Sequence, residues 1–217
     1  MPFRVVCISH TEEAGGAGIG QAVAARLGFR YVDEEIIARA ARTAQVDPAL
    51  VAATEKKQPL LQRLFDAVAA ATVIGSPVAV AGGFFPETPS SQMGLLPTSN
   101  EDLRLLIRAA ILDVAKTGDA VIVAHAASLA LVGKPGVLRV LVTAPDKVRV
   151  RRAAKSRGLP EAEAEAVVEK SDEGRRNYLR TFYEIREELP THYDVVINTE
   201  VLTPEQASEL IVEAARY

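Results

Sequence analysis

Five short runs of apolar, β-prone residues alternate along the chain with segments that have the pattern of helices. Runs that are apolar on both sides are typical of strands buried on both faces, as in a parallel sheet covered by helices. The runs are residues 4–8, 30–32, 120–124, 138–143 and 194–198. This alternation predicts an α/β protein with three layers.

The helical segments carry start and stop signals. The first has an apolar residue at every fourth position and is closed by Gly28; its apolar residues are Ile19, Val23 and Leu27. A second stripe ends before Gly118 and consists of Leu103, Leu106, Ile107, Ala110, Ile111 and Val114. Thr203 and Gln206 form a capping-box pattern around Pro204. We therefore expect the last helix to begin near Pro204.

Composition limits the class of protein. The chain has 217 residues, 48% of them hydrophobic, which suffices for one domain with a sizeable core. A formal net charge of −3 argues against nonspecific binding to nucleic acid. Cys7 is the single cysteine and lies in an apolar run, so we expect a buried thiol and no disulfide.

Membrane and metal signals are weak in this sequence. No apolar stretch is long enough to span a bilayer, and no signal peptide is recognisable, so we expect a cytoplasmic protein that binds no membrane. The spacing of His10, His125 and His192 supports no metal site, and we predict none.

Residues 75–100 differ from the rest of the chain because they have no helical period. The segment contains four prolines and four glycines. A loop of this length inside a compact domain is typically a lid, a binding loop or a disordered excursion. Two interpretations stay open. The segment is either disordered or an oligomer contact, which would be compatible with a homodimer, or it is a mobile segment on the substrate side.

A glycine-rich stretch, residues 8–20, joins the first apolar run to the first helical pattern. At such a junction, backbone N–H groups and the helix dipole converge on one point and favour an anion. Gly15, Gly16 and Gly18 would let the anion approach closely. The dinucleotide pattern G-x-G-x-x-G fails at Gln21, and the Walker A pattern also fails. On the loop alone, a tight turn without a ligand is an alternative.

Further motifs, taken in order, resemble the cytidylate-kinase-like family of P-loop nucleoside monophosphate kinases. The resemblance covers nearly the full length, and the order and separation of the motifs carry it. The motifs are Ile8-Ser9, Gly15-Gly16 and Ile19-Gly20, followed by residues 25–33, 121–123, 149–152, 172–178 and 193–199. The resemblance implies one domain over residues 1–217, with a five-stranded parallel sheet of order 2-3-1-4-5 and a lid-like helical segment at about 155–185.

The resemblance also implies a nucleotide as partner, with ATP and Mg²⁺ as cofactors. The donor phosphates would lie on Ala14, Gly15, Gly16, Ala17, Gly18 and Ile19. The acceptor nucleotide would be held by Asp33, Arg39 and His125. The predicted catalytic residues lie in the lid and its hinge, namely Arg149, Arg152, Asp172 and Arg175. The arginines would neutralise charge on the transferred phosphoryl group, and Asp172 with Arg175 matches the D-x-x-R pattern of the lid.

The sequence departs from the family pattern within the loop. Glu13 stands where relatives commonly have glycine, and it brings negative charge toward the phosphates. Gly16 occupies the place of the Walker lysine, and Gly18 offers no hydroxyl to Mg²⁺. His10 and His125 stand where relatives have arginine. Each loss of a charge-stabilising group typically lowers a rate by about 10²–10³, which fits a slow kinase and an inactive relative equally.

Simpler interpretations of the same residues compete. The arginines and lysine of residues 149–157 could form a solvated helix face, and Asp172 and Arg176 have the spacing of an ordinary i,i+4 pair. Asp33 could cap a helix beginning near Glu34. Two functional hypotheses follow: a nucleoside monophosphate kinase, and a degenerate relative that binds a nucleotide or a partner protein without chemistry.

Overall fold

A parallel sheet forms the centre of the computed structural model, which describes residues 2–33, 100–123 and 126–217. The strand order among these residues is β2-β3-β1-β4-β5, with every neighbouring pair parallel. The strands are β1 (Val5–His10), β2 (Arg30–Val32), β3 (Ala120–Ile122), β4 (Val137–Thr143) and β5 (Val195–Asn198). The structure thus confirms the predicted fold class and strand order.

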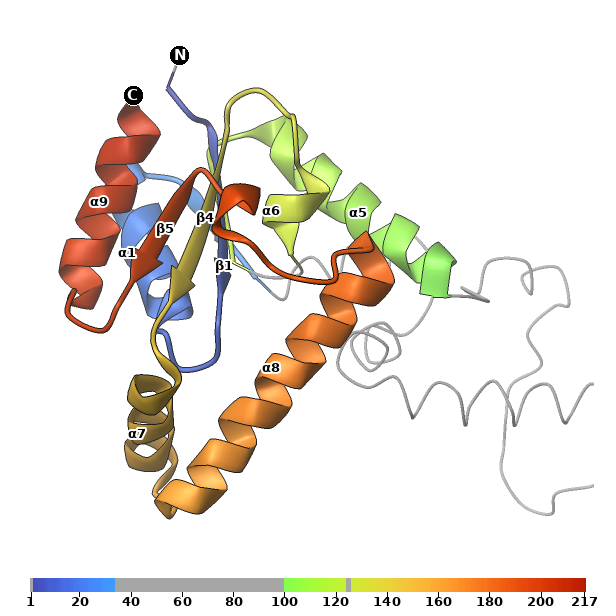
Figure 1. Cartoon of the computed structure of the whole chain (residues 1–217). Helices are drawn as coiled ribbons and strands as arrows, with labels where there is room; N and C mark the ends of the chain where they lie inside the picture. The colour runs from blue at the N-terminus through green and yellow to red at the C-terminus, as the bar shows by residue number, and fades with distance from the viewer. Residues whose placement is uncertain (1, 34–99, 124–125) are drawn as a thin grey trace, which may run out of the picture.

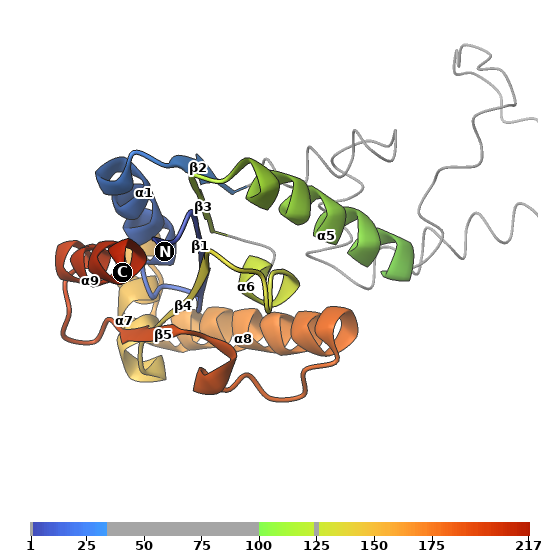
Figure 2. The same cartoon turned by 90° about the horizontal axis from the view of Figure 1, so that it is seen from above.

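Helices cover both faces of the sheet (Figure 1; Figure 2). On one face, α1 (Gly16–Leu27) and α9 (Pro204–Arg216) pack against Val6, Ile8 and Val140. On the other, α5 (Asn100–Thr117), α6 (Ala127–Ala130) and α8 (Glu161–Tyr183) pack against alternate residues of the same strands, Val5, Cys7 and Val137. Two apolar cores therefore lie on opposite sides of one sheet, as runs that are apolar on both faces require.

The predicted helix ends are confirmed. Gly28 and Gly118 follow α1 and α5 with φ of 69° and 71°, a backbone region in which glycine is favoured. Thr203 caps α9, and its hydroxyl accepts from the backbone N–H of Gln206 at 3.3 Å. α1 also packs closely on the sheet, since a Cβ added at Gly20 would lie 2.4 Å from Val123 Cγ2.

Two helices extend past the C-terminal edge of the sheet and pack on each other, α7 (Asp146–Arg157) and α8 (Glu161–Tyr183) (Figure 1). A small core lies between them, formed by Val150, Ala153, Ala164 and Val168. The predicted lid-like segment of about 155–185 therefore comprises the end of α7 and all of α8. Its movement as a lid stays a prediction.

Several predictions fall on parts of the chain outside the described residues. Arg39, His125 and residues 75–99 of the predicted loop belong to these parts, as does the last residue of the predicted third strand. β1 is longer than predicted and continues to His10, because its register with β4 extends to the pair His10–Val142. Among the described helices, none is both long enough and apolar enough to cross a membrane.

Candidate functional site

The glycine-rich loop leaves the end of β1 and turns directly into α1. The turn is closed by a hydrogen bond from the Ala14 N–H to the Thr11 carbonyl at 3.2 Å. Glu13 and Gly15 both adopt left-handed backbone conformations, with φ of 59° and 86°. The first turn of α1 contains no acidic residue, and Gly15, Ala17 and Gly18 are exposed. Its free amides and the helix dipole therefore provide partial positive charge at the edge of the sheet.

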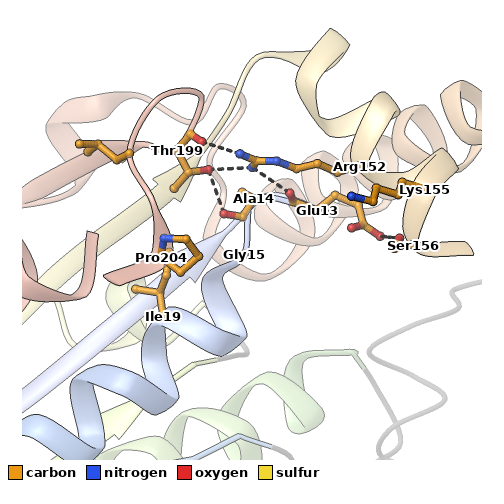
Figure 3. A pocket seen from close by; sticks show the side chains of 10 residues that line it. Glu13, Ala14, Gly15, Ile19, Arg152, Lys155, Ser156, Thr199 and Pro204 are labelled. Atoms are coloured by element: carbon orange, nitrogen blue, oxygen red, sulfur yellow. Dashed lines mark hydrogen bonds between the residues drawn. The ribbon is translucent and has the colours of Figure 1, made fainter. Parts of the chain in front are cut away.

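The carboxylate of Glu13 is held by the end of α7. It accepts hydrogen bonds from Ser156 Oγ at 3.1 Å and Arg157 Nε at 3.4 Å, and Glu12 also pairs with Arg157. In Figure 3 the Glu13 side chain extends toward Ser156. The negative charge of Glu13 thus lies against Arg157, which it shares with Glu12.

A cavity of about 560 Å³ lies beside the loop, between it, α7 and the start of α9 (Figure 3). This volume is in the range of pockets that bind small molecules. Ile19, Leu202 and Pro204 provide apolar lining, and the remaining lining residues are Glu13, Ala14, Gly15, Arg152, Lys155, Ser156 and Thr199. The cavity therefore combines an apolar wall with a basic one.

Arg152 is fixed on the basic side of this cavity. Its guanidinium donates to Thr199 Oγ1 at 3.0 Å, to the Thr199 carbonyl at 2.5 Å and to the Glu13 carbonyl at 3.3 Å. Thr199 Oγ1 in turn donates to the Ala14 carbonyl at 3.0 Å. These bonds fix the guanidinium of a residue that lines the cavity.

Arg149 lies one turn earlier on α7 and is buried, with 3% of its side chain exposed. It forms a bidentate pair with Asp172 at 2.9 and 2.6 Å and donates to Asp146 at 2.7 Å and to the Ala144 carbonyl at 3.1 Å. The hydrogen bond with Asp172 raises the pKa of Arg149 above its usual value. Asp172 thus joins α8 to α7 through Arg149, 23 residues away, in place of the i,i+4 pairing with Arg176.

Arg175 connects α8 to the end of β1. It pairs with both carboxylate oxygens of Glu188 at 2.7 and 2.6 Å, and it donates to the His10 carbonyl at 3.1 Å. Tyr193 also bonds to Glu188. Burial raises the pKa of Glu188, but the hydrogen bonds from Arg175 and Tyr193 and the charge of Arg175 together outweigh it and hold that pKa below the usual value. Burial, followed by the charge of Glu188, raises the pKa of Tyr193.

Asp33 directly follows β2 and lies at the same edge of the parallel sheet as the loop. Its carboxylate is half-buried and accepts a hydrogen bond from the Tyr31 hydroxyl at 3.3 Å. Burial of Tyr31, reinforced by the charge of Asp33, raises the pKa of Tyr31 to about 12. The other predicted acceptor residues, Arg39 and His125, lie outside the described part of the chain.

The structure brings Arg152 to one cavity with three of the six predicted loop residues, namely Ala14, Gly15 and Ile19. Arg149 and Arg175 instead lie in ion pairs with Asp172 and Glu188. The sequence prediction missed four residues that position these groups: Thr199, Ser156, Glu188 and Tyr193. Thr199 had a usable signal, because it directly follows the last predicted strand, at the edge where the loop lies. Glu188 had none, since its partner Arg175 is on another element.

The strand order and the helices on both faces of the sheet are those of a P-loop kinase fold. Residues 5–201 match the cytidylate kinase-like family, and the chain belongs to this family. A similar protein is the cytidylate kinase of Aeropyrum pernix, which is 33% identical over 126 residues, covering 58% of this chain and 73% of that enzyme.

Solved structures share the fold at low sequence identity. An uncharacterised protein from Eubacterium ventriosum superposes with a TM-score of 0.62 at 14% identity, with 97% of each chain covered. Shikimate kinase from Bacteroides thetaiotaomicron superposes with a TM-score of 0.51 at 13% identity, again with 97% of each chain covered.

Proposed function

We propose that this protein binds ATP at the glycine-rich loop and transfers its γ-phosphoryl group to a nucleoside monophosphate. The observation that carries the proposal is the contact between the loop and the cavity. Gly15 lines the cavity and also immediately precedes the first residue of α1. A nucleotide with its base in the cavity would therefore place its phosphates near the amides at the start of the helix.

The base would lie between Arg152 and the apolar wall of the cavity. Ile19, Leu202 and Pro204 offer apolar contact on one side. The guanidinium of Arg152, held by Thr199, offers a rigid planar face on the other. An aromatic base stacks well on such a face. In this proposal Arg152 contacts the base, while the phosphates lie on Ala14, Gly15, Gly16, Ala17, Gly18 and Ile19.

The reaction is a displacement at the γ-phosphorus. An oxygen of the acceptor's phosphate forms the new P–O bond, the bond between the γ-phosphorus and the bridging β-oxygen breaks, and ADP leaves with the electron pair. An acceptor phosphate is already anionic, so the step needs no general base and depends on positioning and charge neutralisation. Asp33, with Arg39 and His125, would hold the acceptor.

Mg²⁺ is best considered part of the MgATP substrate. The described residues contain no cluster of three or more metal-ligating side chains, and Gly18 supplies no hydroxyl. The protein groups therefore fit a metal that is held mainly by the phosphates of the nucleotide, which is the usual preference of Mg²⁺.

A second candidate function is nucleotide binding without transfer. It is favoured by the ion pairs of Arg149 with Asp172 and of Arg175 with Glu188, because two of the three predicted catalytic arginines are bound to carboxylates. For either arginine to neutralise a phosphoryl group, its pair would have to open or be shared. The two candidates differ only in turnover.

The test combines calorimetric titration with MgATP and a coupled assay against CMP, dCMP, UMP and AMP. We expect ATP binding and turnover with one acceptor. Arg152→Ala should weaken ATP binding about tenfold or more, as expected for a lost stacking contact. Arg151→Ala is the matched control, since Arg151 is exposed and bonds only within α7 among the described residues. Binding without turnover would favour the second candidate, and no binding by folded protein would contradict both.

A further inference from the structure

Position 16 of the loop has no room for a side chain, because His10 fills the space in front of it. A Cβ built on Gly16 would lie 2.3 Å from His10 Cβ, 2.4 Å from Cγ and 2.6 Å from Cδ2. Gly16 is the first residue of α1 and follows the last glycine of the turn. In a Walker A loop this is the place of the lysine that reaches the β- and γ-phosphates. The imidazole therefore occupies the space that the lysine side chain would enter.

The position of His10 is fixed from two directions. Its Nδ1 lies 3.1 Å from the Thr11 carbonyl, and its own carbonyl accepts a hydrogen bond from Arg175 at 3.1 Å. A carbonyl only accepts, so Nδ1 carries a hydrogen in this contact. Among the residues that the structure describes, no hydrogen bond to Nε2 is found. Within that part of the chain, the second ring nitrogen is open to a ligand.

We propose that His10 supplies the phosphate contact that lysine supplies in a Walker A loop, with Nε2 donating to the terminal phosphates of bound ATP. Phosphate oxygens only accept hydrogen bonds, so the ring takes part as the imidazolium, with a hydrogen on each nitrogen. The inference rests on the proposed function, because it assumes that ATP phosphates lie on this loop. It assigns Arg175 to holding the histidine backbone and Gly16 to leaving room for the ring.

The first test compares ATP with adenosine, which has the same base but no phosphate. His10→Gln removes the charge, and His10→Arg restores a cation at the same position. We expect His10→Gln to weaken MgATP binding about tenfold to a hundredfold, as for loss of a charged hydrogen bond, with adenosine binding unchanged. His10→Arg should recover most of the ATP affinity. Equal ATP affinity of the wild type and His10→Gln would overturn the inference, and so would an equal loss of adenosine and ATP binding.

The second test removes the side chain of His10 at the end of β1 and places a lysine at position 16, the first residue of α1. Even alanine at position 10 would collide with a side chain at position 16, because the closest approach is to Cβ itself. The comparison therefore uses His10→Gly alone and together with Gly16→Lys. The double variant should bind MgATP about tenfold more tightly than His10→Gly. Equal affinities of two folded proteins would overturn the inference; if either fails to fold, the first test decides.

The outcomes also separate this inference from the proposed function. If the wild type binds ATP and His10→Gln binds it equally well, the inference is overturned and the proposed function is not. A folded wild-type protein that binds neither ATP nor adenosine overturns the proposed function and the inference together.

Discussion

Arg152 and Thr199 are joined by two hydrogen bonds, one to the threonine hydroxyl at 3.0 Å and one to its carbonyl at 2.5 Å. The pair connects α7 to the residue that follows β5. The same hydroxyl donates to the Ala14 carbonyl, and the same guanidinium donates to the Glu13 carbonyl. Two side chains thus hold the glycine-rich loop against the cavity, and the shape of the candidate site depends on them.

Thr199→Val should therefore loosen the site without changing the size of the side chain. Thr199 is only 3% exposed, so the Ala14 carbonyl would lose a buried partner, which typically costs about 1–3 kcal/mol. We expect a fall of that size in the free energy of unfolding, measured by urea denaturation, and weaker binding of ATP. Thr191→Val, at an exposed position, is the control. Identical behaviour of the two variants would show that the hydroxyl does not hold the loop.

The ion pair between Arg149 and Asp172 predicts that replacing Asp172 lowers the free energy of unfolding much more than replacing Asp146. Asp172→Asn removes the bidentate partner of a buried arginine, and breaking such a pair costs about 3 kcal/mol or more. Asp146→Asn removes the other partner, whose side chain is 84% exposed, so its loss should cost less than about 1 kcal/mol. Urea denaturation of both variants measures the difference. Similar small losses would mean that Arg149 does not depend on Asp172.

Glu188 predicts a loss of stability in acid. Its pKa in the folded protein lies below the ordinary value of 4.5, so the unfolded chain takes up a proton first as the pH falls. The stabilisation is fully present above about pH 4.5 and is lost as the pH falls through the folded-state pKa. Unfolding free energies measured from pH 6 to 3 should therefore fall less steeply in Glu188→Gln than in the wild type. Glu187→Gln, at an exposed neighbour, should keep the wild-type slope.

The pairing of Arg157 with Glu13 predicts that Arg157→Ala weakens ATP binding and that a second substitution, at Glu13, restores it. Arg157→Ala releases the carboxylate of Glu13 beside the phosphate site, and its repulsion should weaken ATP binding about threefold to tenfold. Fold stability should change little, because the pair is partly exposed. Adding Glu13→Gln should restore the affinity. If the double variant binds ATP as weakly as Arg157→Ala, the charge of Glu13 is not the cause.

Local patterns predicted most of the fold. The strands are apolar on both sides because both faces are covered, and Gly28, Gly118 and Thr203 lie where three helices begin or end. The strand order followed from the family resemblance, since no local pattern contains it. The end of β1 was missed because its last residues are specified by pairing with β4, which is distant in the sequence.

The site was less predictable because its contacts are long-range. Spacing along a helix favoured Asp172 with Arg176, but the fold brings Arg149 to Asp172 from another helix. The negative charge of Glu13 looked adverse in the sequence, and only the structure shows that it lies against Arg157. Likewise, no pattern indicates that His10 lies over Gly16, since this depends on how β1 turns into α1.

The most direct test of the account is a crystal structure of the protein with Mg²⁺ and a non-hydrolysable ATP analogue. We predict that the base lies in the cavity against Arg152 and that the phosphates contact the amides of Gly15, Gly16 and Gly18. An analogue bound elsewhere, with the cavity and the loop both empty, would contradict the account.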